Sequence, residues 1–171
     1  MVKLTSIFFS AALVVSVLAN PLVGRGLPEL QADFTTIKSQ ATALEARITR
    51  YPNSTGSLAD ARAIHTATVN LDNTIKKTTG CVAQSTAAIA GVEDFEPVII
   101  KALRELINKK QSFVRNGSTA TVKSDLTSFA DNCAKLGGAL VGITHPSKQQ
   151  QAQAAYGRFE TAFDAAIAAY S

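Results

Sequence analysis

The chain has 171 residues, of which 46% are hydrophobic, and it carries 17 basic and 13 acidic side chains for a formal net charge of +4. This length supports one domain with a substantial core, and the small, scattered positive charge excludes the clustered basic face that nucleic-acid binding requires. The lack of Trp and the single Met, at position 1, exclude a methionine-rich groove that adapts to many partners.

The first nineteen residues have the pattern of a secretory signal peptide. Lys3 gives a short basic start, residues 4–18 form an uncharged apolar run, and Ala19 completes a small-residue cleavage motif. Because this run is shorter than the ~20 residues of a membrane-spanning helix, we expect no transmembrane anchor. The expected domains are a signal peptide at 1–19 and an exported helical-bundle domain at 20–171.

Two cysteines and two glycosylation sequons fit an extracellular protein. Cys81 and Cys133 are expected to form one disulfide bond, and the alternative is a pair of buried free thiols. The sequons begin at Asn53 and Asn116, both in turn-like sequence, so we expect both asparagines to be glycosylated at the surface.

The first two predicted helices cover about 28–50 and 57–79. In the first, apolar residues recur at alternating spacings of four and three, which is typical of one helix face: Leu30, Phe34, Ile37, Ala41, Leu44, Ile48 and Tyr51. Ser57 can cap the second helix together with Asp60, and Gly80 breaks it. Its expected inward face comprises Leu58, Ala61, Ile64, Thr68, Leu71 and Ile75.

The middle of the chain leaves one choice open. Ala83 to Gly91 fits either a short separate helix or a continuation of the second one. A third long helix follows over about 92–115, with Pro97 in its first turn, where a missing amide proton matters little. We expect the helix dipole to favour three carboxylates at this N-terminus, namely Glu93, Asp94 and Glu96.

The last two predicted helices begin at Ser118 or Thr119 and just after residues 145–147. The inward face of the fourth comprises Val122, Leu126, Phe129, Cys133, Leu136, Leu140 and Ile143. Its three glycines, at 137, 138 and 142, indicate fraying, close packing or a void for a ligand. No segment alternates like a strand, so we predict an all-α, up-and-down antiparallel bundle of four to five helices with one disulfide.

The sequence contains no motif of catalysis or metal binding. His65 has no ligand-type residue four positions on, His145 precedes a proline, and the HExxH, CxxC and GxSxG patterns are absent. We therefore predict no enzyme activity, no cofactor and no metal site. Large apolar residues are expected to fill the core, and some of them to line an apolar cavity. The candidate ligand-binding residues are Phe34, Phe95, Ile99, Phe113, Phe129, Leu136, Phe159 and Phe163.

One tract resembles a known family. Residues 103–113, Leu-Arg-Glu-Leu-Ile-Asn-Lys-Lys-Gln-Ser-Phe, are followed by Gly117 and by Val122 to Leu126. With the export signal and the order of helices, this tract resembles the fungal hydrophobic surface-binding protein A family, which includes cell-wall galactomannoproteins. The likeness covers about 30–170. It implies a secreted, non-enzymatic helical bundle that adsorbs to hydrophobic solids, recruits a secreted hydrolase, or holds fatty acids between its helices.

The predicted function is that of a monomeric secreted protein that binds a hydrophobic surface or a fatty-acid-like ligand. It is expected to be extracellular or loosely associated with the cell wall, because Tyr170 and Ser171 end the last helix without a Ser/Thr-rich tail. The alternative is an inhibitor or protein partner of an extracellular hydrolase. Plant inhibitors of invertase and pectin methylesterase are helical bundles of this size, but they normally have four cysteines, two of them near an N-terminus that here has none.

Overall fold

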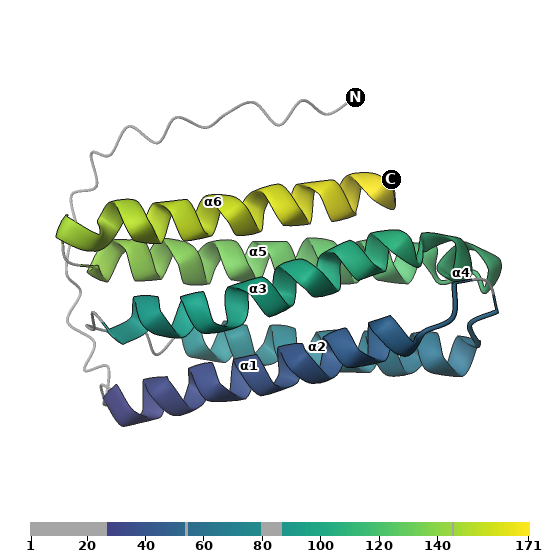
Figure 1. The fold of residues 1–171 in the computed structure, drawn as a ribbon, viewed down its shortest axis with the longest axis horizontal. Coiled ribbons are helices and arrows are strands. Elements are labelled where there is room, and N and C mark those ends of the chain that lie inside the picture. Colours follow the sequence, from purple (N-terminus) through teal and green to yellow (C-terminus); the bar gives the residue numbers. More distant parts are fainter. Residues whose placement is uncertain (1–26, 54, 80–86, 145) are drawn as a thin grey trace.

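The computed structural model describes residues 27–53, 55–79, 87–144 and 146–171, and every regular element in these residues is an α-helix (Figure 1). The helices are α1 (Leu27–Arg50), α2 (Leu58–Thr79), α3 (Ala87–Asn108), α4 (Lys110–Arg115), α5 (Thr119–Ile143) and α6 (Pro146–Ala169). The all-α prediction is confirmed. The predicted signal peptide and Cys81 lie outside the described residues.

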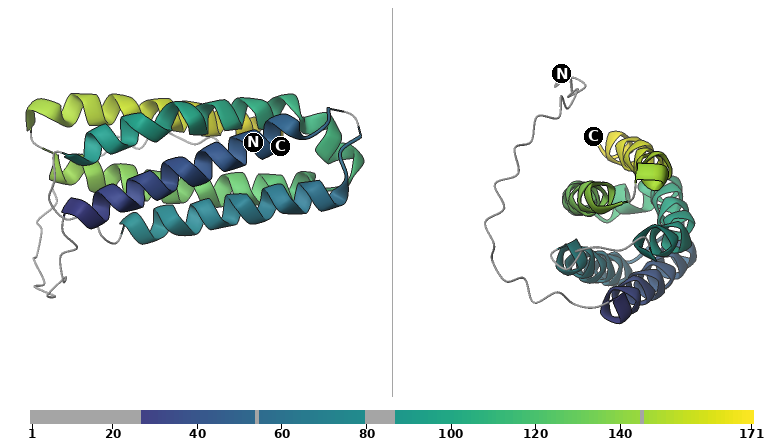
Figure 2. Two further views of the ribbon diagram at one scale, coloured as in Figure 1. Left: turned by 60° about the horizontal axis from the view of Figure 1, so that its bottom comes forward. Right: turned by 90° about the vertical axis from the view of Figure 1, so that its left-hand side faces the viewer.

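The five long helices form a ring whose order differs from their order in the chain. α1 packs against α2 and α3, α2 also packs against α5, α5 against α6, and α6 against α3. The end-on view in Figure 2 shows this closed arrangement. The neighbours α1 and α3, α3 and α6, and α2 and α5 run in the same direction (Figure 1). The predicted antiparallel packing therefore holds for the hairpins α1–α2 and α5–α6 but not for these three contacts.

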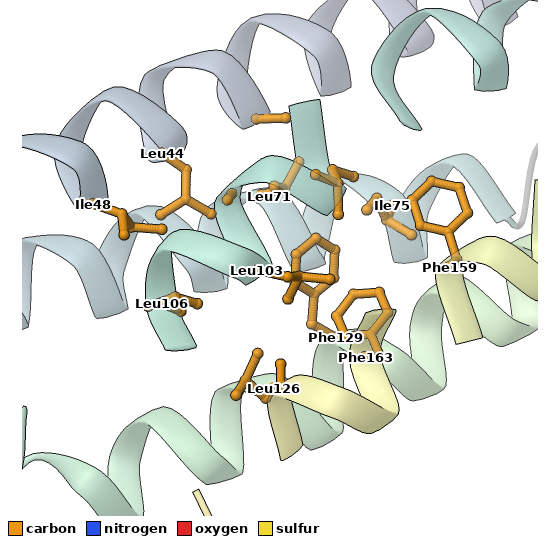
Figure 3. Packing of buried hydrophobic residues seen from close by; sticks show 14 of the residues in the cluster. Leu44, Ile48, Leu71, Ile75, Leu103, Leu106, Leu126, Phe129, Phe159 and Phe163 are labelled. Carbon is orange, nitrogen blue, oxygen red and sulfur yellow. The ribbon is translucent and has the colours of Figure 1, made fainter. Parts of the chain in front are cut away.

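The predicted apolar faces point into the ring. All seven residues of the first predicted face, Leu30 to Tyr51, are buried, with exposed fractions of 0% to 5%. Figure 3 shows side chains from five helices meeting in one core, among them Leu44, Leu71, Leu103, Leu126 and Phe163. Because burial of one such side chain stabilises a fold by about 1.5–3 kcal/mol, these faces are the main source of stability. Leu58 is an exception, since it is exposed, and Cys133 is only half-buried.

The third helix differs from its prediction in its first residue, its last residue and the position of Pro97. It begins at Ala87, so residues 87–91 belong to neither a separate helix nor the second one, and it ends at Asn108, before the short α4. The additional helix turn places Pro97 inside α3 rather than in its first turn. Pro97 has no amide proton to donate to the preceding turn, which weakens the helix locally.

Three carboxylates in the N-terminal half of α3, those of Glu93, Asp94 and Glu96, are held by side chains of other helices. No acidic residue lies in the first turn of α3, so the predicted interaction with the helix dipole is wrong. Asp94 instead pairs with Lys38 on α1, and Glu93 accepts a hydrogen bond from Gln151 on α6. Glu96 is only 6% exposed and forms a two-point ion pair with Arg158 of α6. These contacts join α3 to both of its neighbours in the ring.

The glycines of α5 do not cause fraying, because α5 continues to Ile143. At Gly137 an added Cβ would lie 2.5 Å from the Cδ2 atom of Tyr156, whereas an added Cβ at Gly138 or Gly142 would meet nothing within 4 Å. Gly137 therefore allows close packing of α5 against the Tyr156 ring of α6.

Candidate ligand-binding cavity

The interior space that we assign to a candidate site lies between α1, α2, α3 and α5. It is a cavity of about 340 Å³, within the range of about 300–1,000 Å³ that is typical of ligand pockets. Its apolar wall consists of Ala41, Leu44, Leu58, Ala61, Ile64, Leu71, Ile99, Ala102, Leu103, Leu106, Val122, Leu126 and Phe129. Six of these side chains are labelled in Figure 3, where they come from all four helices.

The same cavity has a polar end formed by α2 and α5. The polar lining residues are Arg62, His65, Thr68, Ser118, Thr121 and Asp125. Arg62, His65 and Thr68 lie in the N-terminal half of α2. Ser118 directly precedes α5, and Thr121 and Asp125 lie in its first two turns. The two helices run side by side in the same direction. The cavity is thus polarised, with one charged end and a hydrocarbon-like interior.

A short hydrogen-bonding contact lies across this polar end. His65 Nδ1 and Asp125 Oδ2 are 2.6 Å apart. Burial raises the pKa of the Asp125 carboxyl above its ordinary value, and the hydrogen bond with His65 partly opposes this shift. Further along the same seam, Asp72 accepts hydrogen bonds from Ser128 at 2.9 Å and from Asn132 at 2.8 Å. Polar side-chain contacts therefore bridge α2 and α5 beside the apolar cavity.

A second, smaller cavity lies between α3, α5 and α6. It measures about 40 Å³ and its lining includes Phe95, Cys133, Leu136, Ala152 and Phe159. One water molecule occupies about 30 Å³ of liquid, so this space is too small for a lipid chain as it stands.

The candidate ligand-binding residues fall into three groups. Ile99 and Phe129 line the large cavity, and Phe95, Leu136 and Phe159 line the small one. The remaining three, Phe34, Phe113 and Phe163, line neither cavity and fill the core.

Phe113 belongs to an aromatic cluster at the end of the bundle. Its ring stacks on Tyr51 with centroids 4.7 Å apart and meets Tyr170 edge-on at 6.2 Å. The hydroxyl of Tyr170 donates a hydrogen bond of 2.7 Å to the carbonyl of Leu106. Phe113 therefore packs within this cluster, and its predicted contact with a ligand stays a prediction.

The sequence alone missed the polar end of the cavity. The residues on the same helix as His65 offer it no partner, because its partner Asp125 lies sixty positions away, on α5. Nothing in the sequence marks Arg62 as a ligand-binding residue, because exposed basic residues are common on helix faces. Only the adjacency of α2 and α5, which periodicity does not reveal, brings these groups together. Among the described residues, no three His, Cys, Asp or Glu side chains are grouped as a metal site.

The predicted modification sites differ in their surroundings. Asn53 is exposed in the turn after α1. Asn116 is half-buried, and its side-chain nitrogen, which would carry a glycan, donates a hydrogen bond to Tyr51. Cys133 is half-buried on α5. The disulfide stays a prediction, since Cys81 lies outside the described residues.

Comparison with known proteins identifies a family model and a fold. The model described as hydrophobic surface binding protein A matches residues 27–142. The crystal structure of AFMP4P in complex with palmitic acid has a TM-score of 0.78 and 23% identity, over 84% of this chain and 99% of that one. Ligand binding domain 2 of the Penicillium marneffei MP1 protein, in complex with arachidonic acids, has a TM-score of 0.77 and 16% identity, over 88% and 97%.

A larger structure, ligand binding domains 1 and 2 of the Talaromyces marneffei Mp1 protein, has a TM-score of 0.76 and 16% identity, over 85% of this chain and 48% of that one. At these identities the likeness concerns the fold. No curated protein sequence matches the chain.

Proposed function

This chain belongs to the hydrophobic surface binding protein A family, and on that premise we propose that it is a secreted protein that encloses a fatty-acid-like molecule between α1, α2, α3 and α5. The family binds hydrophobic surfaces and is not enzymatic. The prediction of a non-enzymatic family member is thereby confirmed.

The apolar cavity is the observation that carries the proposal. Removing hydrocarbon from water gains about 25 cal/mol per Å². Enclosing a long alkyl chain therefore supports binding near micromolar affinity, even after the free-energy cost of ordering the ligand. Two proteins of the same fold are bound to palmitic acid and to arachidonic acids, which supports the same chemical class here.

Adsorption to a hydrophobic solid would use the same interior. The large hydrophobic side chains exposed in the described part of the chain are Leu58, Val69 and Val114, which are isolated residues rather than a broad patch. Strong adsorption therefore requires the bundle to open and expose its core. The polar contacts between α2 and α5 make this seam the proposed place of opening, because water can replace hydrogen bonds at smaller cost than apolar packing.

Several further features are part of the proposal. Secretion is supported by the signal-peptide pattern of residues 1–19. Among the described helices, none is long and apolar enough to cross a membrane. A Cys81–Cys133 disulfide, glycosylation at Asn53 and Asn116, a monomeric state and loose cell-wall association remain predictions from the sequence. Recruitment of a secreted hydrolase, and the alternative role as its inhibitor, are expectations drawn from the family resemblance and from chain size.

The test is retention of a lipid by the protein from its native secretion. Mass spectrometry under conditions that preserve non-covalent complexes should show the chain with one added mass in the range of a long-chain fatty acid. Uptake of hexadecanoic acid and adsorption to hydrophobic beads should both exceed those of a helical bundle of equal charge. If both match that control while a wall hydrolase is bound or inhibited, the lipid proposal fails and the alternative replaces it.

A further inference from the structure

Among the described residues that line the large cavity, Arg62 is the one Lys or Arg side chain. It lies on the exposed side of α2, one turn before His65, and it takes part in none of the ion pairs found within the described residues. The other charged group at this end, Asp125, is already paired with His65 at 2.6 Å. Arg62 is thus a positive charge at the mouth of an apolar cavity that forms no ion pair with Asp125.

The surroundings of Arg62 also suit an anion. The hydroxyl-bearing residues Ser118 and Thr121 line the same end of the cavity. Ser118 directly precedes α5 and makes no side-chain capping hydrogen bond to it. The N-terminus of α5, whose positive dipole end favours a negative group, therefore contributes to the same cavity lining as Arg62.

Apolar lining residues lie beside these groups and continue along α2 away from them. From Arg62 to Leu71, α2 rises by about 13 Å, and over this length its inward residues Ile64 and Leu71 face Leu103 and Phe129 in the cavity wall. A ligand with one charged end and a hydrocarbon tail can therefore satisfy both ends only in a single orientation. A neutral molecule gains the apolar contacts alone.

We infer that Arg62 holds the ionised headgroup of the ligand at this end, so that the cavity selects a free fatty acid over a neutral lipid with the same chain. This inference rests on the proposed function and assigns an orientation to the ligand. The carboxylate lies at the α2–α5 mouth between Arg62 and Thr121, and the tail points toward Phe129. Asp125 is engaged by His65 at 2.6 Å, which leaves Arg62 as the charged group that can meet the carboxylate.

The test compares an acid with its neutral counterpart. Hexadecanoic acid and hexadecan-1-ol are titrated at neutral pH into the full mature chain and into three variants, Arg62→Gln, Arg62→Lys and Lys76→Gln. Lys76 is the matched control, because it is also an exposed base on α2 but does not line the cavity. Thermal unfolding of each variant checks that the exposed substitution leaves the bundle folded.

The wild-type chain should bind the acid more tightly than the alcohol. Arg62→Gln should weaken acid binding by about tenfold, as expected for loss of a charge-assisted contact, and leave alcohol binding within about twofold. Arg62→Lys should retain most of the preference, and Lys76→Gln should match the wild type.

The inference is overturned, with the cavity proposal intact, if the wild type binds both molecules equally or if Arg62→Gln weakens both to the same extent or neither. The same holds if Arg62→Lys loses the preference as completely as Arg62→Gln. If the wild type binds neither molecule, the proposed function is wrong as well.

Discussion

The side-chain amide of Asn116 donates a hydrogen bond to the hydroxyl of Tyr51, which joins the residue after α4 to the residue after α1. Tyr51 also stacks on Phe113, and the Asn116 carbonyl oxygen accepts a hydrogen bond of 3.2 Å from the Ser118 amide. The Asn116 side chain thus fixes both the turn before α5 and the aromatic ring of Tyr51, which closes this end of the core. A glycan on Asn116 would use the same nitrogen.

The first prediction concerns this contact. Asn116→Ala should lower the free energy of unfolding by about 1–2 kcal/mol, because it leaves the Tyr51 hydroxyl without its donor. Asn53→Ala, the matched change in an exposed turn, should stay within about 0.5 kcal/mol of the wild type. Chemical denaturation of unglycosylated protein measures both. Equal effects at the two positions would show that the Tyr51 contact is not formed.

The second prediction uses two adjacent glycines of α5. Gly137→Ala should destabilise the protein by about 1–3 kcal/mol, because the new methyl group would overlap the Tyr156 ring. Gly138→Ala should stabilise it by about 0.5–1 kcal/mol, because Ala favours the helix and meets no neighbour. Thermal unfolding of the two variants gives the sign of each change. A stabilising Gly137→Ala would mean that α5 and α6 are further apart than described.

The helix faces could be predicted from the sequence, and the arrangement of the helices could not. Alternating spacings of three and four locate the buried side of a helix, and the face from Leu30 to Tyr51 is buried throughout. The same spacings are satisfied whichever helix lies opposite, so they carry no information on the contact between α2 and α5. Pro97 was misplaced for a related reason, since its position depends on where α3 begins.

The candidate site divides in the same way. Ile99 and Phe129 lie on apolar stripes and line the large cavity, and their contact with a ligand stays a prediction. Phe113 lies on the same kind of stripe, yet it packs between Tyr51 and Tyr170. Nothing in a single helix distinguishes a side chain beside a cavity from one in a filled core, because the difference depends on residues of other helices. Arg62 and His65 are recognisable as candidate binding residues only from the packing of α5 beside α2.

The third prediction compares a two-point ion pair, with Arg158 52% and Glu96 8% exposed, with a one-point pair, with Lys101 64% and Glu45 14% exposed. Arg158→Met should lower the free energy of unfolding by about 1.5–3 kcal/mol, because Glu96 is buried and would lose both of its hydrogen bonds. Lys101→Met removes the partner of Glu45 at 3.0 Å, and since Lys101 is 64% exposed its loss should change stability by at most about 1 kcal/mol. Denaturation at neutral pH tests both, and a larger effect at Lys101 would contradict the account of α3 and α6.

The fourth prediction concerns the two cysteines. Unfolded protein from the native secretion, treated with an alkylating reagent without reductant, should gain no mass, and after reduction it should gain two adducts. In the reduced, folded protein Cys133 should react slowly at neutral pH, because burial raises the pKa of its thiol and leaves little thiolate. Two adducts on unfolded protein without reductant would exclude the disulfide.

The most direct test of the central claim is to fill the large cavity from within. Ala102 lines it from α3 and is 4% exposed, whereas Ala152 lines the small cavity from α6 and is 8% exposed. Isothermal titration of hexadecanoic acid should give about one site of near-micromolar affinity for the wild type and for Ala152→Leu. For folded Ala102→Leu it should show binding weakened by about tenfold or more, because the larger side chain occupies the ligand's space. Equal affinity of Ala102→Leu and wild type, with the variant folded, would show that the ligand does not bind between α1, α2, α3 and α5.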